Sequence, residues 1–164
     1  MTNLTAWLEG TALATWVRED PSIWAYPTIL TLHTVGLGIV VGASAVVDLR
    51  LLGYGRKLRV GALAPLFPIM ACAFTLNALS GVLLFIADAT IKSGQWIFYV
   101  KLLSIFAALW VTFATRRIVL DNPFEAPNGR DHIPANGTRL ALASMVLWAA
   151  AVTAGRLMAY IGVP

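Results

Sequence analysis

Charged residues are scarce in this 164-residue sequence, where Asp, Glu, Lys and Arg make up 12% and hydrophobic residues make up 59%. An ordinary soluble domain carries about 25% charged residues. The composition therefore argues against a soluble enzyme with a conventional core. It also argues against a nucleic-acid partner, because the formal charge of +4 is better explained by membrane topology than by a basic binding surface.

Cysteine is also nearly absent, since Cys72 is the only one in the sequence. This chain alone cannot form an intrachain disulfide, a thiolate zinc site or an iron–sulfur site. We expect Cys72 to be a small core residue. The sequence has no Walker motif, metalloprotease helix or Gly-x-Ser-x-Gly elbow, and the glycines from Gly36 to Gly42 have the wrong spacing for a dinucleotide fingerprint.

The hydrophobic residues are concentrated in four long runs that are almost free of charge. Each run can cross about 30 Å of hydrocarbon as a helix, and none shows the alternation of a barrel strand. The sequence therefore predicts an all-α fold, an integral membrane four-helix bundle in a single transmembrane domain over residues 1–164. The predicted spans are Ala25–Val47, Leu63–Ala87, Trp96–Thr115 and Leu140–Ile161.

The basic residues predict the orientation of these spans. Residues 48–61 and 116–139 together contain eight Lys and Arg, whereas the connections on the opposite side contain Arg18 and Lys92. The positive-inside rule places the two basic connections in the cytoplasm and both termini outside, in a bacterial inner membrane. Aromatic residues at the predicted outer span ends agree with this orientation: Trp24, Tyr26, Trp96, Tyr99 and Tyr160.

Two flanking segments have weaker signals. The first twenty residues lack a basic start and contain Glu9, so we expect them to be retained. The spacing of Leu4, Leu8, Ala12 and Trp16 favours an interfacial helix on the outer surface, with a partly ordered tail as the alternative. Asp20-Pro21 resembles a capped helix start for the first span. Turn signals in 116–139 predict a loop and no second domain.

The ionisable residues inside the spans are the best candidates for a site. His33 lies roughly 12 Å below the outer end of its span, Lys101 and Arg156 lie roughly 8 Å deep, and Asp88 closes the second span. All four are expected in the outer leaflet. They are either separate anchors that reach toward the headgroups or the lining of one shared pocket.

Two cofactors suit such a pocket. A b-type haem would take His33 as its axial metal ligand, with Lys101 and Arg156 near the propionates and Gly36 leaving room for the porphyrin. A quinone would accept hydrogen bonds from His33 or Lys101, with Asp88 passing protons to the outer water. Both cofactors imply electron transfer, and it also remains open that no cofactor is bound.

A haem raises the question of a second axial ligand. The only other histidine, His132, is expected in the cytoplasmic loop. Met158 reaches the correct leaflet, but at 100° per residue it faces about 160° away from Arg156, so both cannot point inward. The alternatives are a His33–Met158 pair, a five-coordinate iron, or a haem shared across a homodimer.

Small and polar residues within the spans predict helix packing. Gly38 with Gly42 in the first span, and Ala151 with Gly155 in the fourth, have the four-residue spacing that brings membrane helices close together. The spacing predicts that these two spans pack together, with glycines of no structural effect as the alternative. Asn77 lies midway along the second span and is expected to form a hydrogen bond across helices.

The stretch His33-Thr34-Val35-Gly36, continuing through Gly42 to Asp48-Leu49-Arg50-Leu51-Leu52-Gly53, resembles a pattern in uncharacterised small bacterial four-span membrane proteins. These are distantly similar to copper-resistance D-type and cytochrome b-like helical bundles. The resemblance implies that His33 is a ligand or pocket residue and that Asp48 and Arg50 form a helix-end ion pair on the cytoplasmic side. The chain departs from the b-type pattern because it lacks a second membrane histidine.

Three functions follow from these patterns. The first is a membrane subunit of an electron-transfer system that works with other membrane or periplasmic redox proteins. The second is a non-redox scaffold that assembles through the glycine-rich helix face. The third is a small-solute or metal-ion permease, which is disfavoured because the inner halves of the spans offer no matching polar path.

Overall fold

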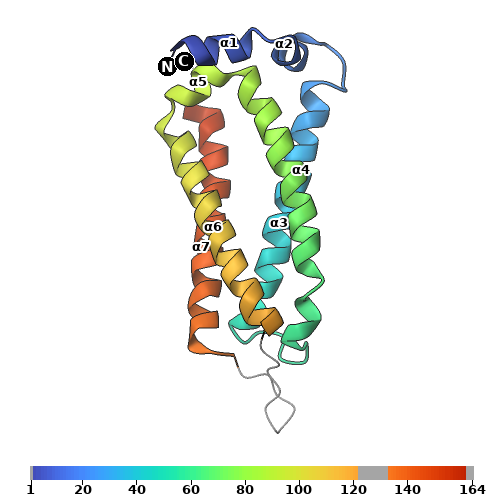
Figure 1. Ribbon diagram of the computed structural model, residues 1–164, viewed down its shortest axis with the longest axis vertical. Coiled ribbons are helices and arrows are strands. Elements are labelled where there is room, and N and C mark those ends of the chain that lie inside the picture. Colours follow the sequence, from blue (N-terminus) through green and yellow to red (C-terminus); the bar gives the residue numbers. More distant parts are fainter. Residues whose placement is uncertain (1, 122–132, 162–164) are drawn as a thin grey trace.

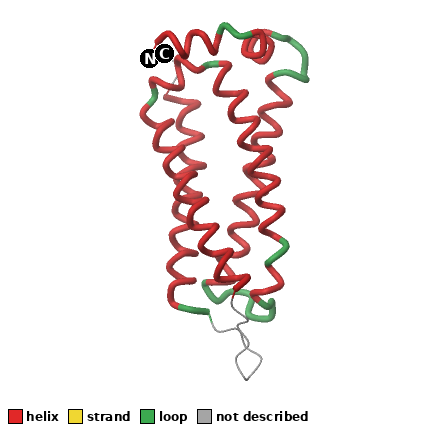
Figure 2. Tube along the Cα trace, viewed as in Figure 1, coloured by secondary structure: helices red, strands yellow, loops and turns green. Residues whose placement is uncertain are grey.

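The computed structural model describes residues 2–121 and 133–161, and within these residues it contains helices and no strand (Figures 1 and 2). The all-α prediction is confirmed. The elements in chain order are α1 (Thr2–Glu9), α2 (Ala12–Glu19), α3 (Tyr26–Leu51), the 3-10 helix η1 (Val60–Leu63), α4 (Leu66–Ala87), α5 (Ala89–Gly94), α6 (Trp96–Asp121) and α7 (Ala135–Ile161). The predicted loop around His132 falls outside the described residues.

The four long helices α3, α4, α6 and α7 are long and apolar enough to cross a membrane. Only 22–28% of the residues in their most apolar windows are buried inside the protein. The remaining apolar side chains need a nonpolar solvent, since water-soluble proteins do not expose such continuous surfaces. The chain is a multi-pass membrane protein in which lipid covers the outside of the bundle.

Three of the four long helices, α3, α6 and α7, extend beyond the predicted spans at the end that carries the basic connections, which we call the inner end. α6 continues to Asp121 and α7 begins at Ala135, whereas the hydropathy pattern predicted limits at Thr115 and Leu140. Hydropathy reports the thickness of the hydrocarbon layer, and a helix can continue into water once its backbone hydrogen bonds are formed.

The bundle consists of two closely packed pairs. α3 packs along α4, and α6 packs along α7, while α3 also contacts α7 and so joins the pairs. α4 and α6 do not pack extensively against each other. In Figure 1 the pairs lie on opposite sides of the bundle and run nearly parallel along its long axis. This arrangement leaves room between the pairs wherever large side chains do not fill it.

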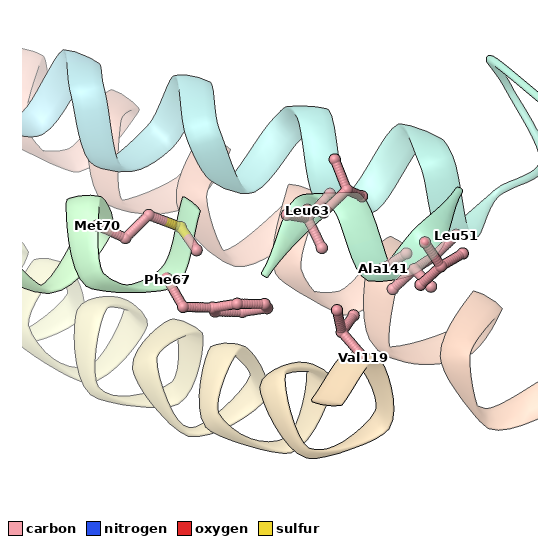
Figure 3. Packing of buried hydrophobic residues seen from close by; sticks show 8 residues of the cluster. Leu51, Leu63, Phe67, Met70, Val119 and Ala141 are labelled. Carbon is pink, nitrogen blue, oxygen red and sulfur yellow. The ribbon is translucent and has the colours of Figure 1, made fainter. Parts of the chain in front are cut away.

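Large apolar side chains do fill that room at the inner end (Figure 3). Leu51, Leu63, Phe67 and Met70 gather there from α3, η1 and α4 and meet residues of α6 and α7. A second buried cluster closes the middle of the bundle. It contains Val40, Ala73, Ala108, Trp148 and Ala151.

Glycine brings α3 and α4 together, but at a different position from the one predicted. A Cβ atom at Gly36 would lie 2.9 Å from the Ala73 carbonyl oxygen, so this residue permits close helix contact. Gly38 and Gly42 are exposed, and nothing would lie within 4 Å of an added Cβ. α3 and α7 do contact each other, as predicted, but not through these two glycines, because the spacing does not reveal which face of a helix turns inward.

The outer end of the bundle is covered by α1, α2 and α5, which lie across the ends of the long helices (Figure 1). The expected interfacial helix is divided in two, and Thr11 caps α2 by accepting a hydrogen bond from the Ala14 amide at 3.3 Å. α2 buries Ala14 and Val17 and leaves Trp16 exposed. The break divides the predicted apolar stripe, so that Leu4 and Leu8 lie on α1 whereas Ala12 and Trp16 lie on α2.

Two further local predictions are corrected. The Asp20 carboxylate does accept a hydrogen bond, from the Ser22 amide at 2.7 Å, but the first long helix begins only at Tyr26. Cys72 is exposed on the bundle surface and does not belong to the core. The hydropathy of a span does not distinguish a lipid-facing position from a buried one, since residues at both are apolar.

Candidate functional site

A pocket of about 520 Å³ lies at the outer end of the bundle, and we call it the outer pocket. Residues of α3, α4, α5, α6 and α7 line it, together with Asp88 and Gln95, which flank α5. The lining residues are Tyr26, Leu30, His33, Gly81, Leu84, Phe85, Asp88, Ile91, Lys92, Gln95, Phe98, Lys101, Gly155, Met158 and Ala159. The walls are largely apolar and contain a few polar groups, which is typical of small-molecule sites.

His33 enters the pocket from α3 in an orientation fixed by α4. Its Nδ1 lies 2.9 Å from the Asn77 carbonyl oxygen and 3.2 Å from Ser80 Oγ. A carbonyl oxygen can only accept, so Nδ1 donates the proton and Nε2 retains its lone pair. Asn77 Nδ2 in turn donates to the His33 carbonyl oxygen at 2.7 Å. The predicted interhelical bond of Asn77 is confirmed, and it positions the imidazole.

Gly81 provides the space beside the imidazole. A Cβ atom at this position would lie 3.0 Å from His33 Cε1. On the adjacent wall, Phe85 and Phe98 stack with their ring centroids 5.1 Å apart and so connect α4 to α6. None of these three residues was predicted from the sequence. The one available signal was the position of Gly81, one helical turn beyond Asn77.

Lys101 enters from α6 and is partly buried against α7. A Cβ atom at Gly155 would lie 3.7 Å from Lys101 Cε and 3.8 Å from its Nζ. Glycine at this position therefore lets the lysine side chain lie along α7 inside the pocket. Among the described residues, Lys101 has no carboxylate within ion-pair distance, so its ammonium group is available to a ligand.

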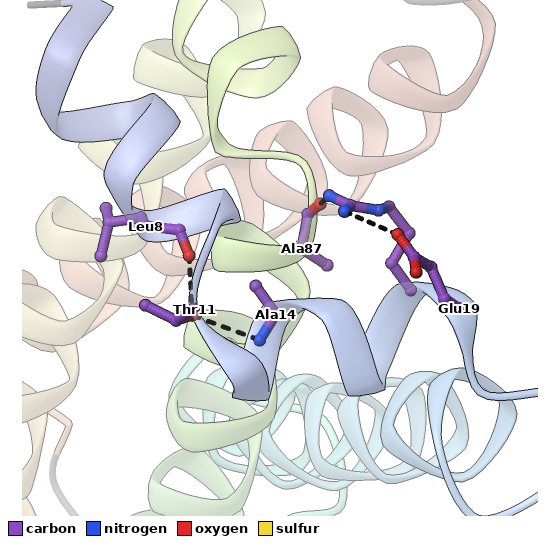
Figure 4. A network of polar contacts seen from close by, with 6 residues as sticks. Leu8, Thr11, Ala14, Glu19 and Ala87 are labelled. Carbon is purple, nitrogen blue, oxygen red and sulfur yellow. Dashed lines mark hydrogen bonds and ion pairs between the residues drawn. The ribbon is translucent and has the colours of Figure 1, made fainter.

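The mouth of the pocket holds an ion pair and two helix-end contacts. Lys92 Nζ lies 3.0 Å from Asp88 Oδ2 and also donates to the Leu84 carbonyl. Arg18 of α2 donates to the Ala87 carbonyl at 3.2 Å, where α4 ends (Figure 4). Glu9 accepts from the Thr90 amide at 2.7 Å. The N-terminal helices therefore hold the loop that carries Asp88.

The structure brings together four of the six predicted site residues. His33, Lys101, Asp88 and Met158 all line the outer pocket. Arg156 is exposed and lies outside the lining, which agrees with the expectation that Arg156 and Met158 cannot both point inward.

Gly36 is the sixth predicted residue, and the role expected for it is wrong. It is buried against the backbone of α4 and does not line the pocket, so it leaves no space for a porphyrin. The reason is the close approach of α3 and α4 at this level. That approach could not be known before the two helices were paired.

Asp48 differs most from its predicted environment. Its side chain is buried, with 3% of the residue exposed, and its carboxylate accepts a hydrogen bond from the Ser144 hydroxyl. Arg50 instead donates from Nε to the Leu58 carbonyl, and no Asp48–Arg50 ion pair is present among the described residues. Residues two apart on a helix face different directions, which prevents the pairing that the resemblance implied.

The described residues contain no group of three or more His, Cys, Asp or Glu side chains that could hold a metal ion. Any metal at His33 would therefore have to arrive within a cofactor. No family model, curated protein or solved structure matches this chain.

Proposed function

We propose that the protein is a membrane subunit of an electron-transfer system and that the outer pocket binds a quinone or its reduced quinol. The observation that carries the proposal is the placement of His33 and Lys101 in one pocket of about 520 Å³. We further propose that the protein resides in a bacterial inner membrane with this pocket near the periplasmic face, as the distribution of basic residues predicts.

The two polar groups have complementary roles toward such a ligand. With Nδ1 bonded to Asn77, Nε2 of His33 accepts a hydrogen bond from a quinol hydroxyl. The Lys101 ammonium donates to a carbonyl oxygen on the ligand. The apolar walls, including the stacked Phe85 and Phe98, accommodate a ring and the start of a hydrocarbon tail.

Oxidation of a quinol to a quinone releases two electrons and two protons. Nε2 of His33 is a proton acceptor in the pocket, and the Asp88–Lys92 pair lies where the pocket meets the outer surface. The two electrons must pass to a partner redox protein in the membrane or periplasm, because none of the side chains that line the pocket can accept them.

A b-type haem is the second candidate, favoured by the presence of Met158 in the same lining as His33. A histidine whose Nδ1 donates to a backbone carbonyl is the usual form of a metal-ligating imidazole. Lys101 would then lie near the propionates. Arg156, which the sequence placed in the same role, is exposed outside the lining.

Ligand analysis of the detergent-purified protein tests the proposal and separates the two cofactors. We expect extraction with organic solvent to release a quinone, and a short-chain benzoquinone to bind the protein in nanodiscs. His33→Ala and Lys101→Gln should each weaken that binding about tenfold or more, as expected for a lost hydrogen bond to a charged or buried group. A reduced-minus-oxidised haem spectrum that disappears in His33→Ala would favour haem.

Arg156→Gln is the matched control for Lys101→Gln, because both residues are cations at similar depth and only Lys101 lines the pocket. We expect Arg156→Gln to bind the benzoquinone as the wild type does. Equal losses in the two variants would indicate a general charge effect and would contradict the proposed site. A colourless, quinone-free protein that binds no benzoquinone would favour the scaffold function.

A further inference from the structure

A second, much smaller cavity lies inside the inner half of the bundle, and we call it the inner cavity. Its volume is about 10 Å³, which is enough for one water-sized species. It is lined by Ser44, Val47, Asp48, Phe67, Met70, Thr112, Thr115 and Ser144, from all four long helices. The buried middle cluster around Trp148 separates it from the outer pocket along the bundle axis.

Two polar atoms of the lining are buried without a partner. Asp48 is 3% exposed and Thr115 is 2% exposed, and within residues 2–121 and 133–161 neither Asp48 Oδ2 nor Thr115 Oγ1 has a hydrogen-bond partner. Unpaired buried polar atoms are rare in native proteins because their desolvation is unfavourable. The penalty is largest for an ionised carboxylate, which indicates that the cavity normally holds something that contacts these oxygens.

The described residues that line the inner cavity include no cationic side chain. Arg50 is the cation nearest to Asp48 along α3, and its Nε donates to the Leu58 carbonyl. Arg116 on α6 and Arg139 on α7 are exposed on the bundle surface. Among the described residues, Asp48 is the one titratable group in the lining, so a positive charge that balances its carboxylate, when ionised, would come from a bound species.

The hydroxyl groups around Asp48 are arranged as acceptors. Ser44 Oγ donates its proton to Met70 Sδ at 3.3 Å, and Thr112 Oγ1 donates to the Ala108 carbonyl at 2.9 Å. The Ser144 hydroxyl donates a hydrogen bond to the Asp48 carboxylate. Their oxygens therefore have lone pairs left to offer. One carboxylate among neutral hydroxyl oxygens balances a single positive charge, whereas divalent cations generally require more carboxylates.

We propose that the inner cavity binds one small monovalent cation, for which Na⁺ is the probe, with Asp48 and Thr115 as its principal ligands. Ser44 and Ser144 complete the oxygen environment. This site is separate from the outer pocket and does not depend on the function proposed for that pocket. It also shows that the inner half of the bundle is less uniformly apolar than the sequence suggested.

Thermal unfolding of the full-length protein in detergent, titrated with NaCl against choline chloride at equal ionic strength, tests this proposal. A ligand that binds only the folded state raises the unfolding temperature saturably. We expect Na⁺ to raise it by about 3–6 °C at ten times the dissociation constant, and choline to have no such effect. Asp48→Asn should abolish the difference between the salts, and Thr115→Val should shift the midpoint of the Na⁺ titration at least tenfold.

Asp88→Asn is the matched control, because it removes a carboxylate at the other end of the bundle and should retain the full Na⁺ response. Identical unfolding temperatures for wild type in the two salts would overturn the proposal, and this comparison requires no variant to fold. An unfolding temperature that rises with acid and not with Na⁺ would also overturn the proposal. Asp48 would then carry a proton, and the cavity would hold water. A Na⁺ response retained in Asp48→Asn would likewise overturn the proposal.

Discussion

The two ends of the bundle are formed by the same four helices, but the space between the helices is filled at one end and open at the other. At the inner end, Phe67, Met70 and Leu51 fill the space between the helix pairs and leave a cavity of about 10 Å³. At the outer end, the corresponding space is lined by glycine, half-buried cations and one histidine, and it measures about 520 Å³. The large side chains of the inner cluster contribute to this difference, and so does α6, which slants toward the α3–α4 pair at the inner end (Figure 1).

This contrast indicates that the inner end stabilises the bundle, whereas the outer end forms the pocket. Lipid is as apolar as the helix surfaces, so association in a membrane depends on close packing and hydrogen bonds more than on apolar burial. The inner cluster supplies the close packing. At the outer end a smaller buried cluster, formed by Val17, Ile29 and Ala87, joins α2 to α3 and α4, and the outer pocket remains open to a ligand.

Removal of a large inner side chain should have the largest effect on stability. We expect Phe67→Ala to lower the free energy of unfolding by about 3 kcal/mol, at the lower end of the range for such substitutions because lipid is an apolar solvent. Phe85→Ala, in the pocket wall, should cost about half as much because its ring already borders open space. Unfolding in mixed micelles measures both, and equal losses would show that the two ends are packed alike.

An added methyl group at the α3–α4 contact should have the next largest effect. Gly36→Ala would place its Cβ 2.9 Å from a backbone oxygen, which we expect to destabilise the protein by about 2 kcal/mol. Gly38→Ala on the same helix is the matched control, since nothing lies within 4 Å of that position. If both variants unfold like the wild type, the two helices are not in the contact described.

Loss of the hydrogen bonds made by Asn77 should have a smaller effect on stability and a clear effect on His33. We expect Asn77→Leu to destabilise the protein by about 1 kcal/mol, within the range for interhelical hydrogen bonds in membranes. The variant should also weaken benzoquinone binding, because it loses the Nδ2 hydrogen bond to the His33 carbonyl oxygen that holds this turn of α3 against α4. A variant that loses stability but binds the quinone normally would show that Asn77 does not position His33.

The smallest expected effect concerns Asp20 in the connection before α3. Its hydrogen bonds with Ser22 hold the pKa of the carboxyl below the ordinary value. A lowered folded-state pKa adds stability at neutral pH, and this contribution is lost as the pH falls below about 4 and through the folded-state value. Asp20→Asn should remove that part of the acid dependence of the unfolding temperature, and an unchanged profile would contradict the assignment.

Much of the fold could be predicted because each span carries its own evidence. The four long helices, the outer-end position of Trp24, Tyr26, Trp96, Tyr99 and Tyr160, and the interhelical role of Asn77 follow from local composition. The helix phase could not be predicted in the same way. Apolar residues cover both the lipid-facing and the buried sides, so nothing in the pattern placed Gly36 inside and Gly38, Gly42 and Cys72 outside.

The candidate site could be predicted only in part, because the rotation of each helix about its axis could not be predicted. His33, Lys101 and Asp88 are conspicuous because ionisable residues are rare in membrane helices. Gly81 and the stacked Phe85 and Phe98 are ordinary span residues until the helices are assembled. Asp48 was assigned to a surface ion pair, although Ser44 one turn earlier on the same helix face was a signal for a buried polar cluster.

The sequence by itself determined that this chain crosses a membrane four times as helices, because continuous apolar runs have no other way to satisfy their backbone hydrogen bonds in hydrocarbon. Only the tertiary structure decided which polar side chains share a cavity. That depends on how each helix is rotated about its axis and which helix it packs against. In a bilayer both are fixed by the fit of individual residues, such as Gly36 against the backbone of α4, and hydropathy does not report that fit.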